Sequence, residues 1–228
     1  MGVVHKSKRN SILLGQDNNA LTWLIIINAT IFILLNFIKI IYMVSDTSMV
    51  AFQVQILDWA VLPGQPANLA EKPWTLFTYM FTHIEVWPMI GTTLWLWWFG
   101  YILQDLSGNS RLAPVYLYSG LAGAFAFVLA TFFIPQLSNS TPAGTSALIG
   151  GGASVMGVAI ATTALAPGYR VFPMLNGGIP LWIITLVFVA IDFSTIGSTS
   201  GNYAVAHLAG GLMGYLFVVQ LGRGYDMG

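Results

Sequence analysis

The sequence predicts an all-α membrane protein with six transmembrane helices and a large embedded loop between the first two. Three observations lead to this fold class. Hydrophobic residues make up 56% of the 228-residue chain and charged residues only 7%, against about 25% charged residues in soluble domains. Six apolar stretches are long enough to cross a bilayer. The basic residues are also distributed unevenly among the segments that join these stretches.

The composition excludes several classes of function. The formal net charge is zero and no basic stripe is present, so we expect no nucleic-acid partner. The chain has no cysteine, which removes disulfides and thiolate nucleophiles. Its three histidines, His5, His83 and His207, lack the spacing of metal ligands. We therefore expect no metal site, and nothing in the sequence suggests a cofactor.

The first apolar stretch follows a basic leader, residues 1–20. This stretch runs from Leu21 to Met43, which is too long for a signal peptide and predicts an uncleaved first span. The chain is expected to consist of the leader and one membrane domain, residues 21–228. The further spans are predicted at Val86–Leu106, Leu112–Phe133, Ala147–Ala166, Ile179–Ile196 and Tyr203–Leu221.

The segment between the first two spans, Val44–Glu85, is too polar to cross the bilayer. It is rich in aromatic residues, which suits a loop embedded in the membrane interface. The distribution of basic residues predicts that both termini are cytoplasmic. In that orientation only Lys39 and Lys72 lie outside, and the other basic residues, Lys6, Lys8, Arg9, Arg111, Arg170 and Arg223, lie on the cytoplasmic side.

Polar residues inside a bilayer are costly, so each points to a function or to a partner. Ser154 and His207 lie in the fourth and sixth predicted spans, and a serine hydroxyl beside an imidazole can act as nucleophile and general base. Most intramembrane serines instead bond to their own helix. His207 can equally serve as an interhelical hydrogen-bonding residue, and Asp192 can accept hydrogen bonds from the loop backbone near Ser194. The residue types alone leave these alternatives open.

Several motifs occur in a characteristic order. Pro73–His83 leads into the second span, Leu94–Gly100 lies within it, Gly152-Ala153-Ser154 lies in the fourth, and Ala206–Gly210 with Gly214 lies in the sixth. In these motifs the chain resembles the rhomboid family of intramembrane serine proteases. The resemblance implies the six-helix rhomboid fold, in which a serine of the fourth span attacks a peptide carbonyl and a histidine of the sixth span is its base. His207 matches that histidine.

The second span departs from the family pattern His-x4-His-x3-Asn, whose side chains stabilise the oxyanion. In this frame the sequence reads His83, Pro88 and Thr92. Proline has no imidazole donor, and threonine is shorter than asparagine and carries a hydroxyl in place of the amide. Both expected oxyanion donors are therefore missing, and the loss of one donor typically costs about 100- to 1000-fold in rate.

The nucleophile position allows two interpretations. Read as Gly-x-Ser, the motif makes Ser154 the nucleophile. An ungapped match to a bacterial rhomboid branch with the motif Gly-Ala-Ser-Ala-(Ser/Ala)-Val-Met instead puts the catalytic serine on Gly152. Residues two apart on a helix point about 200° apart, so only one of the two can face His207. We favour Gly152, because the ungapped frame runs on for many residues.

Three functions follow from these interpretations. The favoured one is a catalytically inactive rhomboid-like protein of the bacterial inner membrane, a pseudoprotease that binds or scaffolds other membrane proteins or transmembrane helices. The alternative is an active intramembrane serine endopeptidase that cleaves transmembrane substrates with a Ser154/His207 dyad, with Thr92 and backbone amides in the oxyanion role. The third is a fixed subunit of a larger membrane complex, which is compatible with the first.

Overall fold

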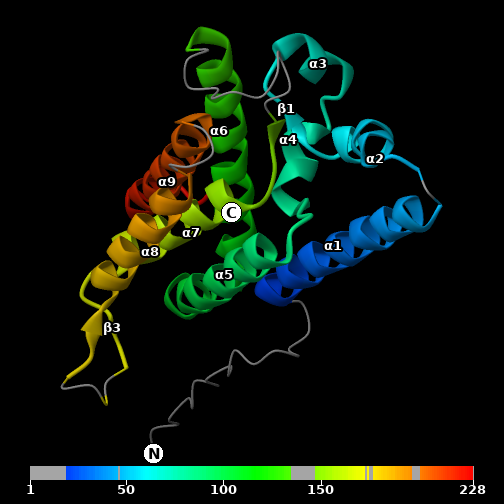
Figure 1. Ribbon diagram of the computed structural model, residues 1–228. Helices are drawn as coiled ribbons and strands as arrows, with labels where there is room; N and C mark the ends of the chain where they lie inside the picture. Colours follow the sequence, from blue (N-terminus) through cyan, green and yellow to red (C-terminus); the bar gives the residue numbers. More distant parts are fainter. Residues whose placement is uncertain are drawn as a thin grey trace, which may run out of the picture.

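The computed structural model describes residues 19–45, 47–134, 147–172, 174, 177–196 and 201–227. Residues 1–18 of the predicted leader lie outside this part of the chain. Helices dominate the architecture (Figure 1). The helices of 14 or more residues in the described part are α1 (Ala20–Val44), α5 (Val86–Ser107), α6 (Leu112–Phe133), α7 (Gly152–Leu165), α8 (Leu181–Ile196) and α9 (Gly201–Gly222).

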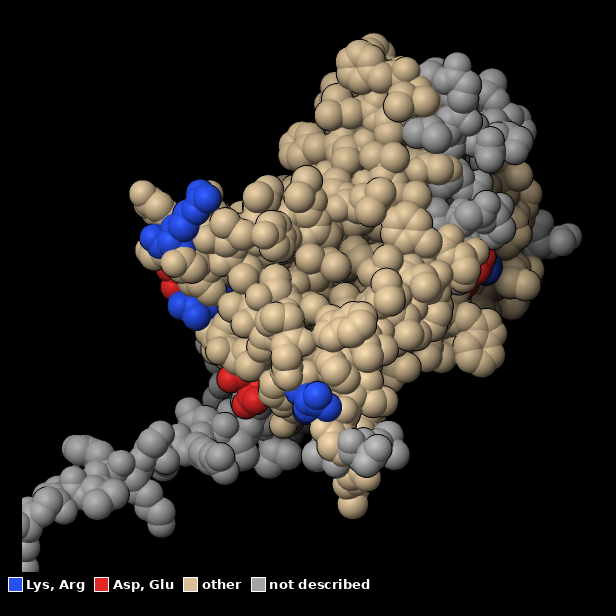
Figure 2. Space-filling model, turned by 90° about the vertical axis from the view of Figure 1, so that its left-hand side faces the viewer, with Lys and Arg blue, Asp and Glu red and all other residues tan. Residues whose placement is uncertain are grey.

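The described helices and their surface are those of an integral membrane protein. By length and hydropathy, three helical segments are candidate spans, Ala20–Val44, Asn109–Phe133 and Gly201–Gly222, while α7 and most of α8 are shorter apolar helices. Figure 2 shows a broad face on which charged residues occur only near the edges. Many large hydrophobic side chains of the described residues are exposed, and a surface of this kind suits contact with lipid. That all six long helices cross the bilayer stays a prediction.

Five of the predicted spans coincide with helices to within two residues at each end. The fourth prediction, Ala147–Ala166, is wrong at its start. Ala147 and Leu148 form the short strand β2, which pairs antiparallel with β1 (Leu62–Pro63), and α7 begins only at Gly152. Hydrophobicity did not reveal this because an apolar run is compatible with either a strand or a helix.

The segment between α1 and α5 folds into short elements. Its elements are α2 (Met49–Gln55), the 3₁₀ helix η1 (Leu57–Trp59), β1, α3 (Pro66–Glu71), α4 (Thr75–Thr78) and the 3₁₀ helix η2 (Tyr79–Phe81). Trp59 and Trp74 stack with their ring centroids 5.7 Å apart. The Tyr79 hydroxyl donates to the Gly120 carbonyl oxygen at 2.6 Å, which ties η2 to α6. The embedding of this segment in the membrane stays a prediction.

Helix α7 lies at the centre of the bundle and packs against α5, α6, α8 and α9. A Cβ added to Gly210 or to Gly214 of α9 would collide with the carbonyl oxygens of Ala153 and Gly157 in α7. On the other side, a Cβ on Gly123 of α6 would lie 2.5 Å from the Ala153 Cβ. Glycines at such points let helix backbones approach closely. The first turns of α7 are therefore wedged between α6 and α9.

Helix α8 is joined to α7 by a hairpin in which β3 (Arg170–Val171) pairs antiparallel with β4 (Ile179–Pro180). Along the helix, Phe188 packs on the rings of Trp95 and Phe99 of α5, with centroid distances of 4.8 and 5.6 Å. The hydroxyl oxygens of Thr163 and Thr185 lie 2.5 Å apart and link α7 to α8. These contacts fix α8 beside α5 and α7.

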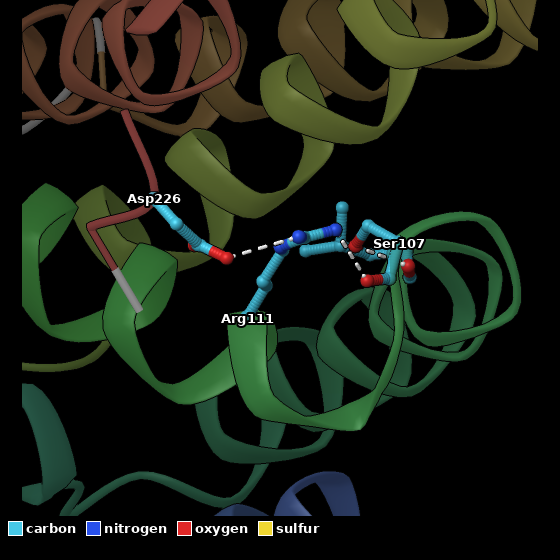
Figure 3. Close-up of polar contacts among 4 residues, drawn as sticks. Ser107, Arg111 and Asp226 are labelled. Atoms are coloured by element: carbon cyan, nitrogen blue, oxygen red, sulfur yellow. Dashed lines mark hydrogen bonds and ion pairs between the residues drawn. The ribbon is translucent and has the colours of Figure 1, made fainter. Parts of the chain in front are cut away.

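The C-terminal tail folds back onto the turn between α5 and α6 (Figure 3). Arg111 donates from Nη1 to the Ser107 carbonyl oxygen at 2.8 Å and from Nη2 to the Asp226 carboxylate at 3.0 Å. The side chains of Arg111 and Asp226 are 28% and 49% exposed. Solvent screens an ion pair with this exposure, so we expect it to contribute little stability.

Candidate functional site

The candidate site lies where the N-terminal turn of α7 meets α9. A run of glycines, Gly150 to Gly152, leads into the helix. Gly150 has a φ of 94°, a left-handed conformation that favours glycine, and its N–H donates to the Tyr79 carbonyl oxygen at 2.9 Å. A Cβ on Gly151 would lie only 2.6 Å from the Tyr116 hydroxyl oxygen. The φ angle at Gly150 and the close approach of Tyr116 at Gly151 therefore both require glycine.

His207 of α9 lies directly against Gly152. A Cβ on Gly152 would overlap with Cε1 and Nε2 of the imidazole and would lie 3.3 Å from Nδ1. The ring edge that carries Nε2 therefore faces the place that a side chain at position 152 would occupy.

The other edge of the same ring is bound to Asp192 of α8. The distance from His207 Nδ1 to Asp192 Oδ2 is 2.7 Å, and the two side chains are only 10% and 14% exposed. An ionised carboxylate can only accept hydrogen bonds, so we assign the hydrogen to Nδ1. His207 Nδ1–H is then the donor, Asp192 Oδ2 is the acceptor, and the hydrogen bond between them joins α9 to α8.

This pair was not predicted from the sequence, where the loop backbone near Ser194 was the expected partner of Asp192. A usable signal was present. Asp192 is the only acidic residue in the last two predicted spans, and His207 is the only histidine in any predicted span. A charged group inside a bilayer needs a partner, and these two residues had no other ionisable partner in those two spans.

Ser154 points away from His207. Its side chain is fully buried and is directed at α6, where a Cβ on Gly120 would lie 2.5 Å from Ser154 Oγ. Its hydroxyl lies on the side of Tyr116 of α6 and makes no hydrogen bond to His207. Helical geometry explains this, since positions 152 and 154 point about 200° apart and Gly152 faces the imidazole.

The two second-span positions bring no clear donor to the site. Pro88 is exposed in the first turn of α5 and has no N–H. Thr92 is half-buried, and the atom of Thr92 that a Cβ on Gly151 would meet is its methyl carbon Cγ2, at 3.4 Å. The described residues therefore place an imidazole beside a carboxylate, and they bring no serine hydroxyl to that imidazole.

His83 occupies a separate buried position beside Gly150. It is 4% exposed, and its Nε2 would lie 3.3 Å from a Cβ on Gly150. Within the described part of the chain neither ring nitrogen has a hydrogen-bond partner. Burial lowers the pKa of His83 to about 4, and the nearby Phe81 backbone has a smaller effect in the opposite direction. The same part of the chain holds no group of three residues suited to a metal ion.

Comparison with protein families matches residues 70–224 to the Rhomboid domain. The match covers more than half of the chain and includes α5 to α9 with every residue of the candidate site. The chain belongs to the rhomboid family. A comparison with curated proteins finds no match for this rhomboid. Of the two positions considered for its nucleophile, Gly152 lies against His207, while Ser154 faces α6.

Proposed function

We propose that this rhomboid is a pseudoprotease, which has lost peptide-bond cleavage and uses its helix bundle to bind or scaffold other membrane proteins. The observation that carries the proposal is the surroundings of His207. Its ring contacts Gly152 on one edge and Asp192 on the other, and within the described part of the chain the hydroxyl of Ser154 makes no hydrogen bond to it. Loss of the nucleophile from a serine protease typically lowers kcat by about 10⁶-fold.

The missing oxyanion donors support the same proposal. Pro88 cannot donate a hydrogen bond from a side chain, and the Thr92 methyl group is the part of that side chain nearest to Gly151. Donors that face a developing oxyanion are often the largest single contribution to acyl-transfer catalysis. We therefore expect no peptide-bond cleavage by a protein that lacks both the nucleophile and these donors.

The proposed partners are transmembrane helices. Leu94 and Trp97 of α5 are 55% and 40% exposed, and Trp182 and Leu186 of α8 are 51% and 60% exposed. In a bilayer such residues face either lipid or another helix. A bundle with this surface can hold a client or take a fixed place in a larger complex. We place it in a bacterial inner membrane with six spans and with both termini in the cytoplasm.

The test uses the protein reconstituted in liposomes with a single-span model substrate. A photo-crosslinking residue replaces Leu186 on α8, and the matched control carries it at Leu212 of α9, which is also 60% exposed. We expect crosslinks from position 186 that exceed those from 212, with no cleavage. Cleavage that disappears in both Ser154→Ala and His207→Ala would establish the active protease instead. A folded protein that neither crosslinks nor cleaves would contradict the binding proposal.

A further inference from the structure

The pairing of His207 with Asp192 has a consequence for Gly152. An imidazole ring is rigid and planar, so a bond that fixes Nδ1 also restricts the position of the opposite edge. That edge, Cε1 and Nε2, occupies the space that a Cβ on Gly152 would need. Any side chain at position 152 therefore requires the ring to move, and a ring that moves must loosen its 2.7 Å contact with Asp192.

The backbone of α7 cannot relieve this overlap by shifting. On the side of α9, the Ala153 carbonyl oxygen lies where a Cβ on Gly210 would be. On the side of α6, the Ala153 Cβ would lie 2.5 Å from a Cβ on Gly123. A helix packed this closely on two sides moves only if the interface on one side opens. Of the two groups that would overlap, the α7 backbone and the His207 imidazole, the imidazole is therefore the one that can move.

We propose that Asp192 is a positioning residue that holds the His207 imidazole in the space of the absent nucleophile side chain. The Asp192 carboxylate of α8 thereby fixes the orientation of the His207 ring between α8 and α9. The fixed ring excludes a side chain from position 152. This inference rests on the proposed loss of activity but is independent of which partner the protein binds. It makes Gly152 and Asp192 energetically coupled although no hydrogen bond joins them.

The test is a double-mutant cycle on thermal unfolding of the full chain in detergent. Gly152→Ala alone should lower Tm by several degrees, because the methyl group displaces the bound ring. In the Asp192→Ala background the ring is free to move, so the same change should lower Tm by less than half as much. Gly91→Ala, at a helical glycine with nothing within 4 Å of its added Cβ, is the control and should add independently to Asp192→Ala.

A spectroscopic readout separates positioning from a general structural role. The chain has only three histidines, so ¹⁵N-imidazole spectra can be assigned with a His207→Gln variant. We expect a hydrogen-bonded Nδ1–H for His207 in the native protein, its retention in Asp192→Asn, whose amide oxygen still accepts, and its loss in Asp192→Ala. This readout remains available if Gly152→Ala does not fold.

Two results would overturn the inference. One is a strictly additive cycle between Gly152→Ala and Asp192→Ala. The other is a His207 imidazole signal that does not change when the carboxylate is removed. Neither result bears on whether the protein cleaves a substrate, so failure of this inference and failure of the pseudoprotease proposal remain distinguishable.

Discussion

His83 should make the folded protein sensitive to acid. The side chain is 4% exposed, has no hydrogen-bond partner among the described residues, and has a pKa of about 4 against an ordinary value of 6.5. The folded state therefore binds the proton less readily than the unfolded state does. At about 1.4 kcal/mol per pKa unit, the full difference amounts to about 3 kcal/mol.

The sign follows from the lowered pKa of a basic group. Above pH 6.5 the histidine is neutral in both states, and its full contribution to stability is present. As the pH falls from 6.5 towards 4, the unfolded state takes up the proton and the folded state does not, so stability is lost across this window. By pH 4.5 the loss from this one residue should reach about 2.5 kcal/mol.

The assay compares the free energy of unfolding in detergent at pH 7.5 and pH 4.5 for the native protein and for His83→Leu. Leucine has a similar size and cannot titrate, so the variant should lose about 2.5 kcal/mol less than the native protein between the two pH values. Carboxylates titrate in both proteins and cancel in this comparison. A His83→Leu protein with the same pH dependence as the native protein would refute the argument from burial.

Three further changes test the packing described above, each by the free energy of unfolding. Gly214→Ala should cost about 1–3 kcal/mol because its methyl group meets the backbone of α7, whereas Gly91→Ala, in open space, should be neutral or stabilising. Equal effects would contradict the close approach of α7 and α9. Tyr79→Phe removes a buried 2.6 Å hydrogen bond to α6 and should cost about 1 kcal/mol; no loss would show that this bond does not hold η2. Asp226→Asn removes an exposed ion pair with Arg111 and should cost less than about 1 kcal/mol, with the difference shrinking at high salt.

The long helices could be predicted from the sequence because a bilayer imposes a simple requirement on length and polarity. α6 was predicted at both ends, and α1 to within one residue, since each is one long apolar run that follows a polar residue, Asn19 before α1 and Arg111 before α6. The start of α7 could not be predicted in this way. Ala147 and Leu148 are as apolar as a helix needs, but they pair with Pro63 and Leu62, which lie 84 and 86 residues away. Pairing over such a distance leaves no mark on local hydrophobicity.

The site was predictable in part for a similar reason. Helical periodicity requires that only one of Gly152 and Ser154 face His207, but it does not say which one. The choice depends on how α7 is rotated against α9, which is determined by the contacts of Gly210 and Gly214 with the α7 backbone. The sequence could suggest Asp192 as a partner of His207, since they are the only acidic residue and the only histidine of the last two predicted spans. That they are in hydrogen-bond contact depends on the relative placement of α8 and α9.

The most direct test of the central claim is to treat the detergent-purified native protein with a fluorophosphonate serine probe, alongside Ser154→Ala and His207→Ala. Ser154 faces α6 and makes no hydrogen bond to His207, so this imidazole cannot act as the general base for its hydroxyl. We expect no labelling of the folded native protein and no difference among the three proteins. Labelling of the native protein that is lost in both variants would contradict this account and establish Ser154 and His207 as a working catalytic dyad.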